Sequence, residues 1–212
     1  MHSAPVLAFS AVTSFALGVG IGLSLIVAIG AQNAFVLGQG IARRHVALVV
    51  AICAVSDAVL ITAGVAGVGA VVDRLPVLVT VVTVAGAVFL LTYGALAFRR
   101  ALRPSALVLG ADRAVSSSRT VALTALALTW LNPHVYLDTM VFLGSVANRE
   151  TGSNRWWFAG GAVVASLLWF TALGVGARFL TPVFARPGAW RVLDLAVGVV
   201  MVVIAVVLIT GL

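Results

Sequence analysis

The chain has 212 residues, of which 62% are hydrophobic and only 9% are charged. A soluble domain of this size carries roughly a quarter charged residues, so this chain could not cover a water-exposed surface. The composition predicts an all-α integral membrane protein. Its 13 basic residues, all arginine, lie almost wholly between hydrophobic runs, which argues against nucleic-acid binding.

Six hydrophobic stretches are long enough to cross a bilayer, because a helix needs ~20 apolar residues to do so. They run over 14–37, 46–72, 76–98, 120–147, 157–181 and 190–211. A cytoplasmic linker at 99–119, rich in arginine and serine, would divide the chain into three-helix repeats at 1–98 and 120–212. Because three is odd, the two halves would be inserted in opposite orientations. We therefore expect six transmembrane helices in a 3+3 inverted repeat.

The two halves share faint sequence similarity at corresponding places. The segment Q-N-A-F-V-L at 32–37 matches L-N-P-H-V-Y-L at 131–137. Each half also has a serine deep in its second span, Ser56 and Ser166. The interface between inverted repeats commonly houses the substrate site, so we expect the site between the two halves.

Helices 1 and 4 both carry signals for a break. Pro133 lacks the amide hydrogen that a helix interior needs, and Asn132 would cap the helix that restarts there. In the first span, Gly30 gives local freedom just before Gln32 and Asn33. A helix that restarts at membrane depth offers N–H groups to an anion, so two such starts could hold one α-carboxylate. The alternative is that both asparagines act only as caps.

The second and fourth predicted spans each contain an aspartate that could carry chemistry. Asp57 is near the middle of the second span, where a carboxylate costs about 2.5–3.5 kcal/mol on insertion scales. No arginine is predicted at that depth, which favours a substrate cation or a proton over a structural ion pair. Gly64, on the same face, leaves room for a group to approach. Asp138 is predicted nearer the entrance, where it could contact substrate, carry protons or form a gating ion pair.

Two ring-bearing side chains accompany Asp138. Trp130 could stack on a guanidinium or ammonium group, although packing is the commoner role of a tryptophan. His134 lies four residues before Asp138 and could serve as a proton relay.

The distribution of arginines predicts the orientation. The connectors after spans one, three and five hold ten of them: Arg43, Arg44, Arg99, Arg100, Arg103, Arg113, Arg119, Arg178, Arg186 and Arg191. The other side holds Arg74, Arg149 and Arg155. This asymmetry predicts that the first set is cytoplasmic and that both termini lie outside. Trp156, Trp157 and Trp190 fall at span ends, where indoles anchor the interface.

Small residues and missing motifs add further expectations. Gly18 and Gly22 are spaced for close helix packing, and this pattern leaves a homodimer open. The single Cys53 excludes an intrachain disulfide and a multi-cysteine metal site. The sequence lacks the Walker A pattern, H-E-x-x-H and G-x-S-x-G, so neither ATP hydrolysis nor an intramembrane enzyme is supported. We expect no catalytic residues, no metal and no cofactor.

Four sequence blocks together resemble the lysine/arginine exporter family of bacterial inner membranes, the LysE superfamily. They are G-A-Q-N-A-F-V-L-G-Q-G-I at 30–41, I-C-A-V-S-D-A-V-L-I-T-A-G at 52–64, L-T-W-L-N-P-H-V-Y-L-D at 128–138 and A-S-L-L-W-F at 165–170. The resemblance extends in order over nearly the whole chain. Ala31 stands where the family pattern has proline, so we expect a gentler first break.

The resemblance implies a secondary exporter of L-lysine or L-arginine in the bacterial plasma membrane. Export of a substrate of charge +1 from an inside-negative cell costs ~2.3 kcal/mol per 100 mV, so we expect coupling to proton influx. The residues expected to bind substrate are Gln32, Asn33, Ser56, Asp57, Trp130, Asn132 and Asp138, with proton coupling by Asp57 or Asp138. The alternatives are an exporter of neutral amino acids or another small solute, and a non-transporting membrane scaffold.

Overall fold

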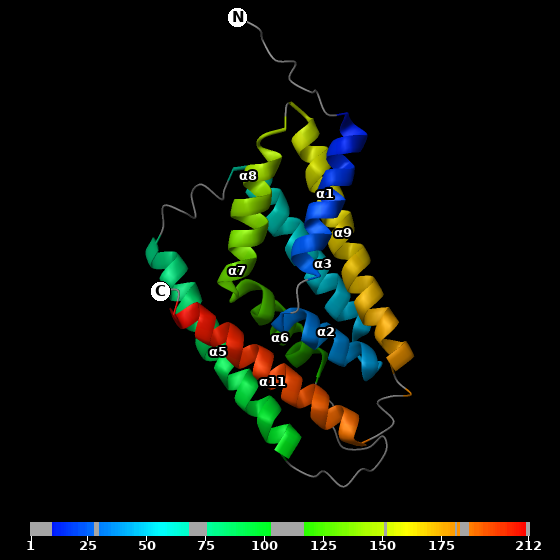
Figure 1. Cartoon of the computed structure of the whole chain (residues 1–212), viewed down its shortest axis with the longest axis vertical. Helices are drawn as coiled ribbons and strands as arrows, with labels where there is room; N and C mark the ends of the chain where they lie inside the picture. The colour runs from blue at the N-terminus through cyan, green and yellow to red at the C-terminus, as the bar shows by residue number, and fades with distance from the viewer. Residues whose placement is uncertain are drawn as a thin grey trace, which may run out of the picture.

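The structure is a computed structural model that describes residues 10–27, 30–67, 76–102, 117–150, 152–180, 182 and 187–210. Within these residues all regular secondary structure is helical, as predicted (Figure 1). Most of the linker, at 103–116, lies outside the described residues. The helical elements below keep the labels of Figure 1.

The first predicted span consists of two helices, α1 (Ala11–Ile26) and α2 (Ala31–Ile41), which meet at 85°. Whether this break is gentler than one with the family's proline stays a prediction. Gly30 precedes α2 in an extended conformation and provides no side-chain cap. Ala31 and Phe35 are buried in the main core, and this packing directs α2 sideways without a proline.

The next two helices are unbroken. α3 (Val46–Val65) has 20 residues and α5 (Pro76–Leu102) has 27. The chain reverses between α2 and α3 in a tight turn in which Arg43 and His45 both have a φ of 53°. An uninterrupted α3 places Asp57 in its middle, on the face that looks into the protein.

The fourth predicted span is broken where Asn132-Pro133 predicted. α6 (Ser118–Trp130) ends before the break, and three elements continue after it without a gap: α7 (Pro133–Val135), the π-helical η1 (Tyr136–Phe142) and α8 (Leu143–Ala147). A π-helical stretch inside a helix is uncommon and is frequently found at functional sites. Asp138 lies in it.

Two long helices complete the chain, α9 (Asn154–Gly176), which η2 (Ala177–Leu180) extends, and α11 (Pro187–Thr210). α1 packs along α9, and Gly22 marks their close approach. A Cβ at Gly22 would lie 3.0 Å from the Cα of Ala162. The prediction that the small residues of α1 serve close helix packing is confirmed.

α3 is the central helix of the arrangement. It contacts α9 on one side and α6, η1 and α8 on the other. α5 and α11 form a separate pair that lies across the lower part of the molecule (Figure 1). This pair is joined to α2 by Tyr93 of α5, whose ring meets that of Phe35 edge-on with 6.3 Å between the centroids.

Four described helices are long and apolar enough to cross a membrane, and the bent pair α1–α2 can be counted as a fifth. The apolar stretch Tyr136–Ala147, after the second break, is too short to be counted by itself. The chain is therefore a multi-pass membrane protein. The exact number of six spans and their inverted repeat stay predictions.

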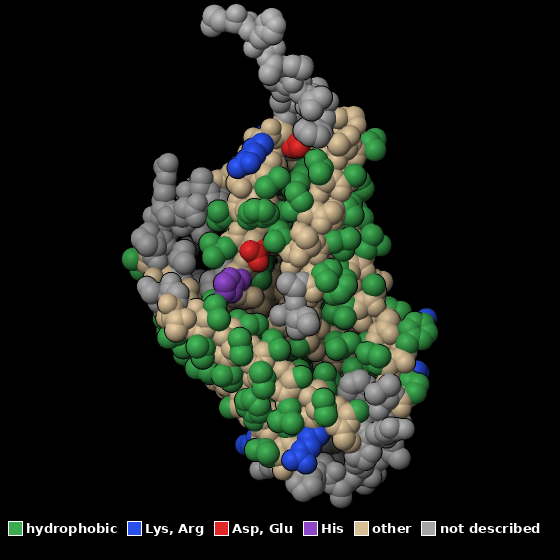
Figure 2. Space-filling model, viewed as in Figure 1, with side chains coloured by type: hydrophobic (Ala, Val, Ile, Leu, Met, Phe, Trp, Pro, Cys, Tyr) green, Lys and Arg blue, Asp and Glu red, His purple; other side chains and the backbone are tan. Residues whose placement is uncertain are grey.

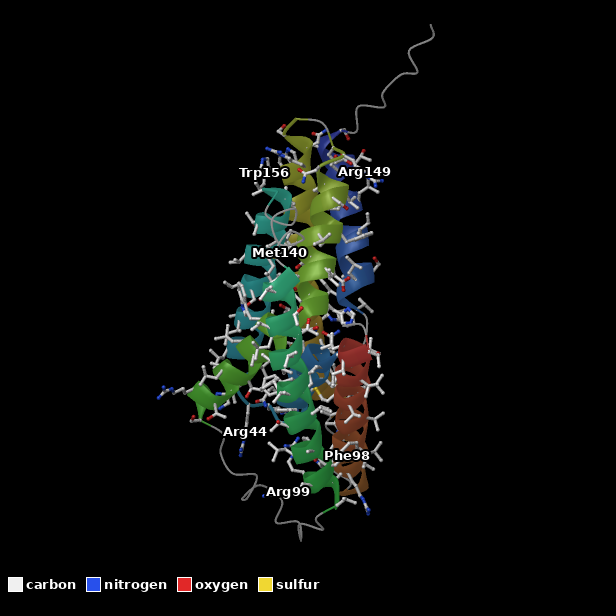
Figure 3. The ribbon with its side chains drawn as sticks, turned by 90° about the vertical axis from the view of Figure 1, so that its left-hand side faces the viewer. Arg44, Phe98, Arg99, Met140, Arg149 and Trp156 are labelled. Atoms are coloured by element: carbon white, nitrogen blue, oxygen red, sulfur yellow. The ribbon has the colours of Figure 1, made fainter. Side chains whose placement is uncertain are left out.

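The arginines lie at the two ends of the molecule. Arg44 and Arg99 lie at one end, and Arg149 and Trp156 lie at the other (Figure 3). On the face shown in Figure 2, hydrophobic side chains predominate between the ends, apart from an acidic side chain beside a histidine about halfway up. Such a belt suits contact with lipid. Which end faces the cytoplasm stays a prediction.

Candidate functional site

A buried carboxylate lies where α3 packs against α9. Asp57 is 4% exposed, and its Oδ2 accepts a hydrogen bond of 2.7 Å from the hydroxyl of Ser166, which is fully buried. In the described part of the chain, no arginine or histidine comes within ion-pair distance of Asp57. A carboxylate is expensive to bury without a cation or a proton, so this site can take one or the other.

The first turn of α2 approaches the same place. Gln32 lies beside the thiol of Cys53, which is fully buried one turn before Asp57 on α3. The side-chain nitrogen of Gln32 is buried and has no hydrogen-bond partner that meets ordinary geometry among the described residues. A buried amide group without a partner is uncommon in proteins and indicates a site for a missing acceptor.

Asn33 connects the first break to α9. Its Nδ2 donates to the carbonyl oxygen of Ile26, the last residue of α1, over 2.8 Å. Its Oδ1 accepts a hydrogen bond of 3.2 Å from the indole nitrogen of Trp169. The interpretation of Asn33 as the cap of the restarted helix is wrong, because α2 begins at Ala31 and Asn33 satisfies the end of α1 instead.

Asn132 does cap the helix that follows the second break. Its Oδ1 accepts a hydrogen bond of 3.1 Å from the backbone N–H of His134, with Pro133 at the first helical position. The carbonyl of Trp130, at the end of α6, accepts a hydrogen bond of 2.8 Å from the Tyr136 hydroxyl across the break. Both breaks therefore have a carbonyl of the earlier helix satisfied by a side chain of the later one.

Trp130 has a polar partner on α3. Its indole nitrogen donates to the hydroxyl of Ser56 over 3.1 Å, which connects α6 to α3. Ser56 is 4% exposed and directly precedes Asp57. The second break is therefore held next to the buried carboxylate.

Asp138 lies apart from this cluster. It is half-buried in η1, four residues after His134, and no described interaction joins it to Asp57 or Ser166. His134 is exposed. Whether Asp138 lies nearer an entrance than Asp57 stays a prediction.

The room predicted beside Gly64 is filled by the protein itself. A Cβ at Gly64 would lie 2.6 Å from the Cα of Met140, and a Cβ at Gly144 would lie 2.5 Å from the Gly64 carbonyl oxygen. Met140, which Figure 3 labels, is in η1. The two small residues let α3 and the helix after the second break touch backbone to backbone.

Three residues form polar interactions in the structure although no role was assigned to them from the sequence. Trp169 is in the block A-S-L-L-W-F, which signalled the family, and Tyr136 is in the block around Asn132. Asp194 is 8% exposed in α11, and its carboxylate pairs with Arg100 of α5 over 3.3 Å. The signal for Asp194 was an acid in an apolar span, the same signal that pointed to Asp57.

A multi-pass helical protein with two broken helices and a buried carboxylate beside them belongs to the class of membrane transporters by architecture. The comparisons with known proteins identify the family. The family described as LysE type translocator matches residues 23–212. The chain belongs to this family, whose members are transporters and not enzymes.

Three relatives cover almost the whole chain. The provisionally named amino-acid transporter Rv0488 of Mycobacterium tuberculosis is 48% identical over 185 residues, 87% of this chain and 91% of the relative. The arginine exporter protein ArgO of Yersinia enterocolitica is 44% identical over 191 residues, 90% of this chain and 93% of ArgO. ArgO of Serratia proteamaculans is also 44% identical, over 187 residues. No solved structure matches the chain.

Proposed function

We propose that the protein exports L-arginine or L-lysine from the cytoplasm across the bacterial inner membrane in exchange for protons. The observation that carries this proposal is Asp57, a carboxylate in mid-membrane with a neutral hydroxyl as its described partner. A guanidinium, an ammonium or a proton would compensate its charge. The names of the two ArgO relatives support arginine as a substrate.

The α-carboxylate of the substrate would bind at the start of α2. The first N–H groups of a helix have no intrahelical partner, and the partial positive charge of the helix N-terminus favours an anion. Gln32 adds a buried amide nitrogen for which the described residues provide no acceptor of ordinary geometry. Asn132, at the start of the helix after the second break, is the other candidate for this role. Asn33, Ser56, Trp130 and Asp138 stay predicted contacts, the first three through groups that already have internal partners.

Protons are the proposed energy source because the membrane potential opposes export of a cation. Asp57 would hold a proton in one half of the cycle and the substrate cation in the other, so that the two compete for one carboxylate. Asp138, closer to the entrance and to His134, is the second candidate for proton transfer.

We also propose that the two halves form a 3+3 inverted repeat with both termini outside the cell, and that transport takes place between these halves. Its support is the reciprocal packing of the halves: α3 contacts α6, η1 and α8 of the second half, while α9 contacts α1 and α2 of the first. A homodimer stays compatible with this arrangement. Single cysteines placed at each end and labelled from one side of the membrane would test the orientation.

The test of export is counterflow in proteoliposomes, with labelled arginine and with lysine and neutral amino acids as competitors. Wild-type protein should accumulate arginine, lysine should compete, and Asp57→Asn should abolish both exchange and arginine-dependent proton movement. Asp194→Asn is the matched control, since Asp194 is also buried in the membrane region but pairs with Arg100. Exchange of neutral amino acids alone would favour the alternative that the protein exports neutral amino acids. Retention of coupled transport by Asp57→Asn would overturn the proposed role of Asp57.

A further inference from the structure

Two indole N–H groups connect the broken helices to the unbroken ones. The Trp169 indole of α9 donates to Asn33, which itself bonds to the end of α1 across the first break. The Trp130 indole at the end of α6 donates to Ser56 of α3. Each predicted half thus has its break tied to the unbroken helix of the other half.

Both indole hydrogen bonds involve a residue that is close in sequence to Asp57 or to its partner Ser166. Ser56 is the neighbour of Asp57 on α3, and Trp169 follows Ser166 by three residues on α9, about 4.5 Å along the helix axis. The hydrogen bond between Ser166 and Asp57 therefore joins α9 and α3, the two helices to which the broken helices are bonded. Because α3 and α9 are continuous helices of 20 and 23 residues, a movement that separates Ser166 from Asp57 is passed on to both breaks.

We propose that Trp130 and Trp169 are positioning residues that make the two helix breaks change conformation together when Asp57 exchanges its partner. This proposal rests on the transport function proposed above. The indoles act through Ser56 and Asn33 and need no contact with substrate. Without them, each break would open independently of the state of Asp57.

The first test is hydrogen–deuterium exchange of the purified full-length protein, and it does not require a known substrate. Trp169→Phe should accelerate exchange at 131–137 as well as at 30–37, and Trp130→Phe should do the same at both segments. Trp157→Phe is the matched control, because Trp157 is 53% exposed at the other end of α9. Acceleration confined to the break next to the mutated indole would show a local structural role and overturn the proposal.

The second test is the kinetics of arginine exchange in proteoliposomes. Each single variant should lower the maximal rate about tenfold, as expected for loss of one buried hydrogen bond, with KM changed less than about twofold. The double variant should be no slower than the slower single variant, because both ties serve one concerted step. A double loss equal to the product of the single losses, or a raised KM with an unchanged rate, would overturn the proposal.

Replacement of Trp169 by benzothienylalanine controls for the smaller size of phenylalanine. This residue keeps the bicyclic ring and lacks the N–H group, so it should reproduce both effects of Trp169→Phe. Wild-type behaviour would overturn the proposal. If wild-type protein exchanges no basic amino acid, the export function fails, while the deuterium exchange still decides whether the two breaks are coupled.

Discussion

The Ser166 hydroxyl donates a hydrogen bond of 2.7 Å to the carboxylate of Asp57 where α9 packs against α3. The two side chains come from positions 109 residues apart in the chain. One neutral donor offsets only part of the free-energy cost of burying a carboxylate charge. A cation or a proton that binds reversibly can offset the rest.

Ser166→Ala should lower arginine exchange about tenfold or more, because a hydrogen bond to a charged group is worth about 1.5–3 kcal/mol. Ser166→Thr keeps the hydroxyl and should retain more activity than Ser166→Ala. Initial rates of counterflow measure the effect. The control is Ser145→Ala, which removes an exposed hydroxyl bonded only to its own helix at the Phe142 carbonyl. Equal rates for Ser166→Ala and wild type would exclude a role for this bond.

Gly64→Ala should destabilise the protein by about 1–3 kcal/mol, because the added methyl group overlaps the backbone at Met140. The reduced Tm in detergent is the measurement. Gly20→Ala is the matched control, since a Cβ at Gly20 meets nothing within 4 Å. Alanine is also the better helix former there, so Tm should stay the same or rise slightly. A Gly64→Ala variant as stable as Gly20→Ala would contradict the backbone contact between α3 and η1.

Asn132→Ala should cost about 1 kcal/mol of stability, because it removes the side-chain acceptor at the start of the helix after the break. Asn132→Ser or Asn132→Asp can accept the same hydrogen bond and should stay close to wild type. Thermal unfolding of the three variants side by side measures the difference. If all three lose arginine exchange while only alanine loses stability, then Asn132 has a substrate contact in addition to its cap.

Arg100→Gln should destabilise the pair α5–α11 more than Asp194→Asn does. The Asp194 side chain is 12% exposed and that of Arg100 is 42% exposed, so removing the arginine takes a partner from the more buried charge. The difference should be about 0.5–1 kcal/mol, given that the guanidinium is well solvated. Tm values in low and high salt test it. A larger loss for Asp194→Asn would mean that Asp194 stabilises the pair mainly through other groups.

The sequence predicted the features that depend on local chemistry. Asn132-Pro133 predicted the break in the fourth span, because a helix interior cannot accommodate a residue without an amide hydrogen. Asp57 was recognisable because no neighbour along the chain could compensate it. The first break was harder to predict, since Ala31 carries no such signal and the direction of α2 depends on the burial of Phe35 against distant helices.

The polar partners could not be predicted, because each pair joins residues far apart in the sequence. The Trp130 indole nitrogen bonds to Ser56, 74 residues away. Asn33 and Trp169 are separated by 136 residues. Side-chain directions depend on how α3, α9 and the broken helices are rotated against each other, and this rotation is set by the packing of the whole core.

The sequence by itself determined that this is a helical membrane protein of the LysE family with an aspartate inside an apolar helix, because hydrophobicity, helix breakers and family blocks are local properties. Only the tertiary structure decided that Ser166 donates to Asp57, that Gln32 lies beside Cys53 and that two indoles bond to partners on or next to the opposite helices. A hydrogen bond requires its two atoms to come within about 3 Å. Among helices, that distance is decided by packing and not by the order of residues.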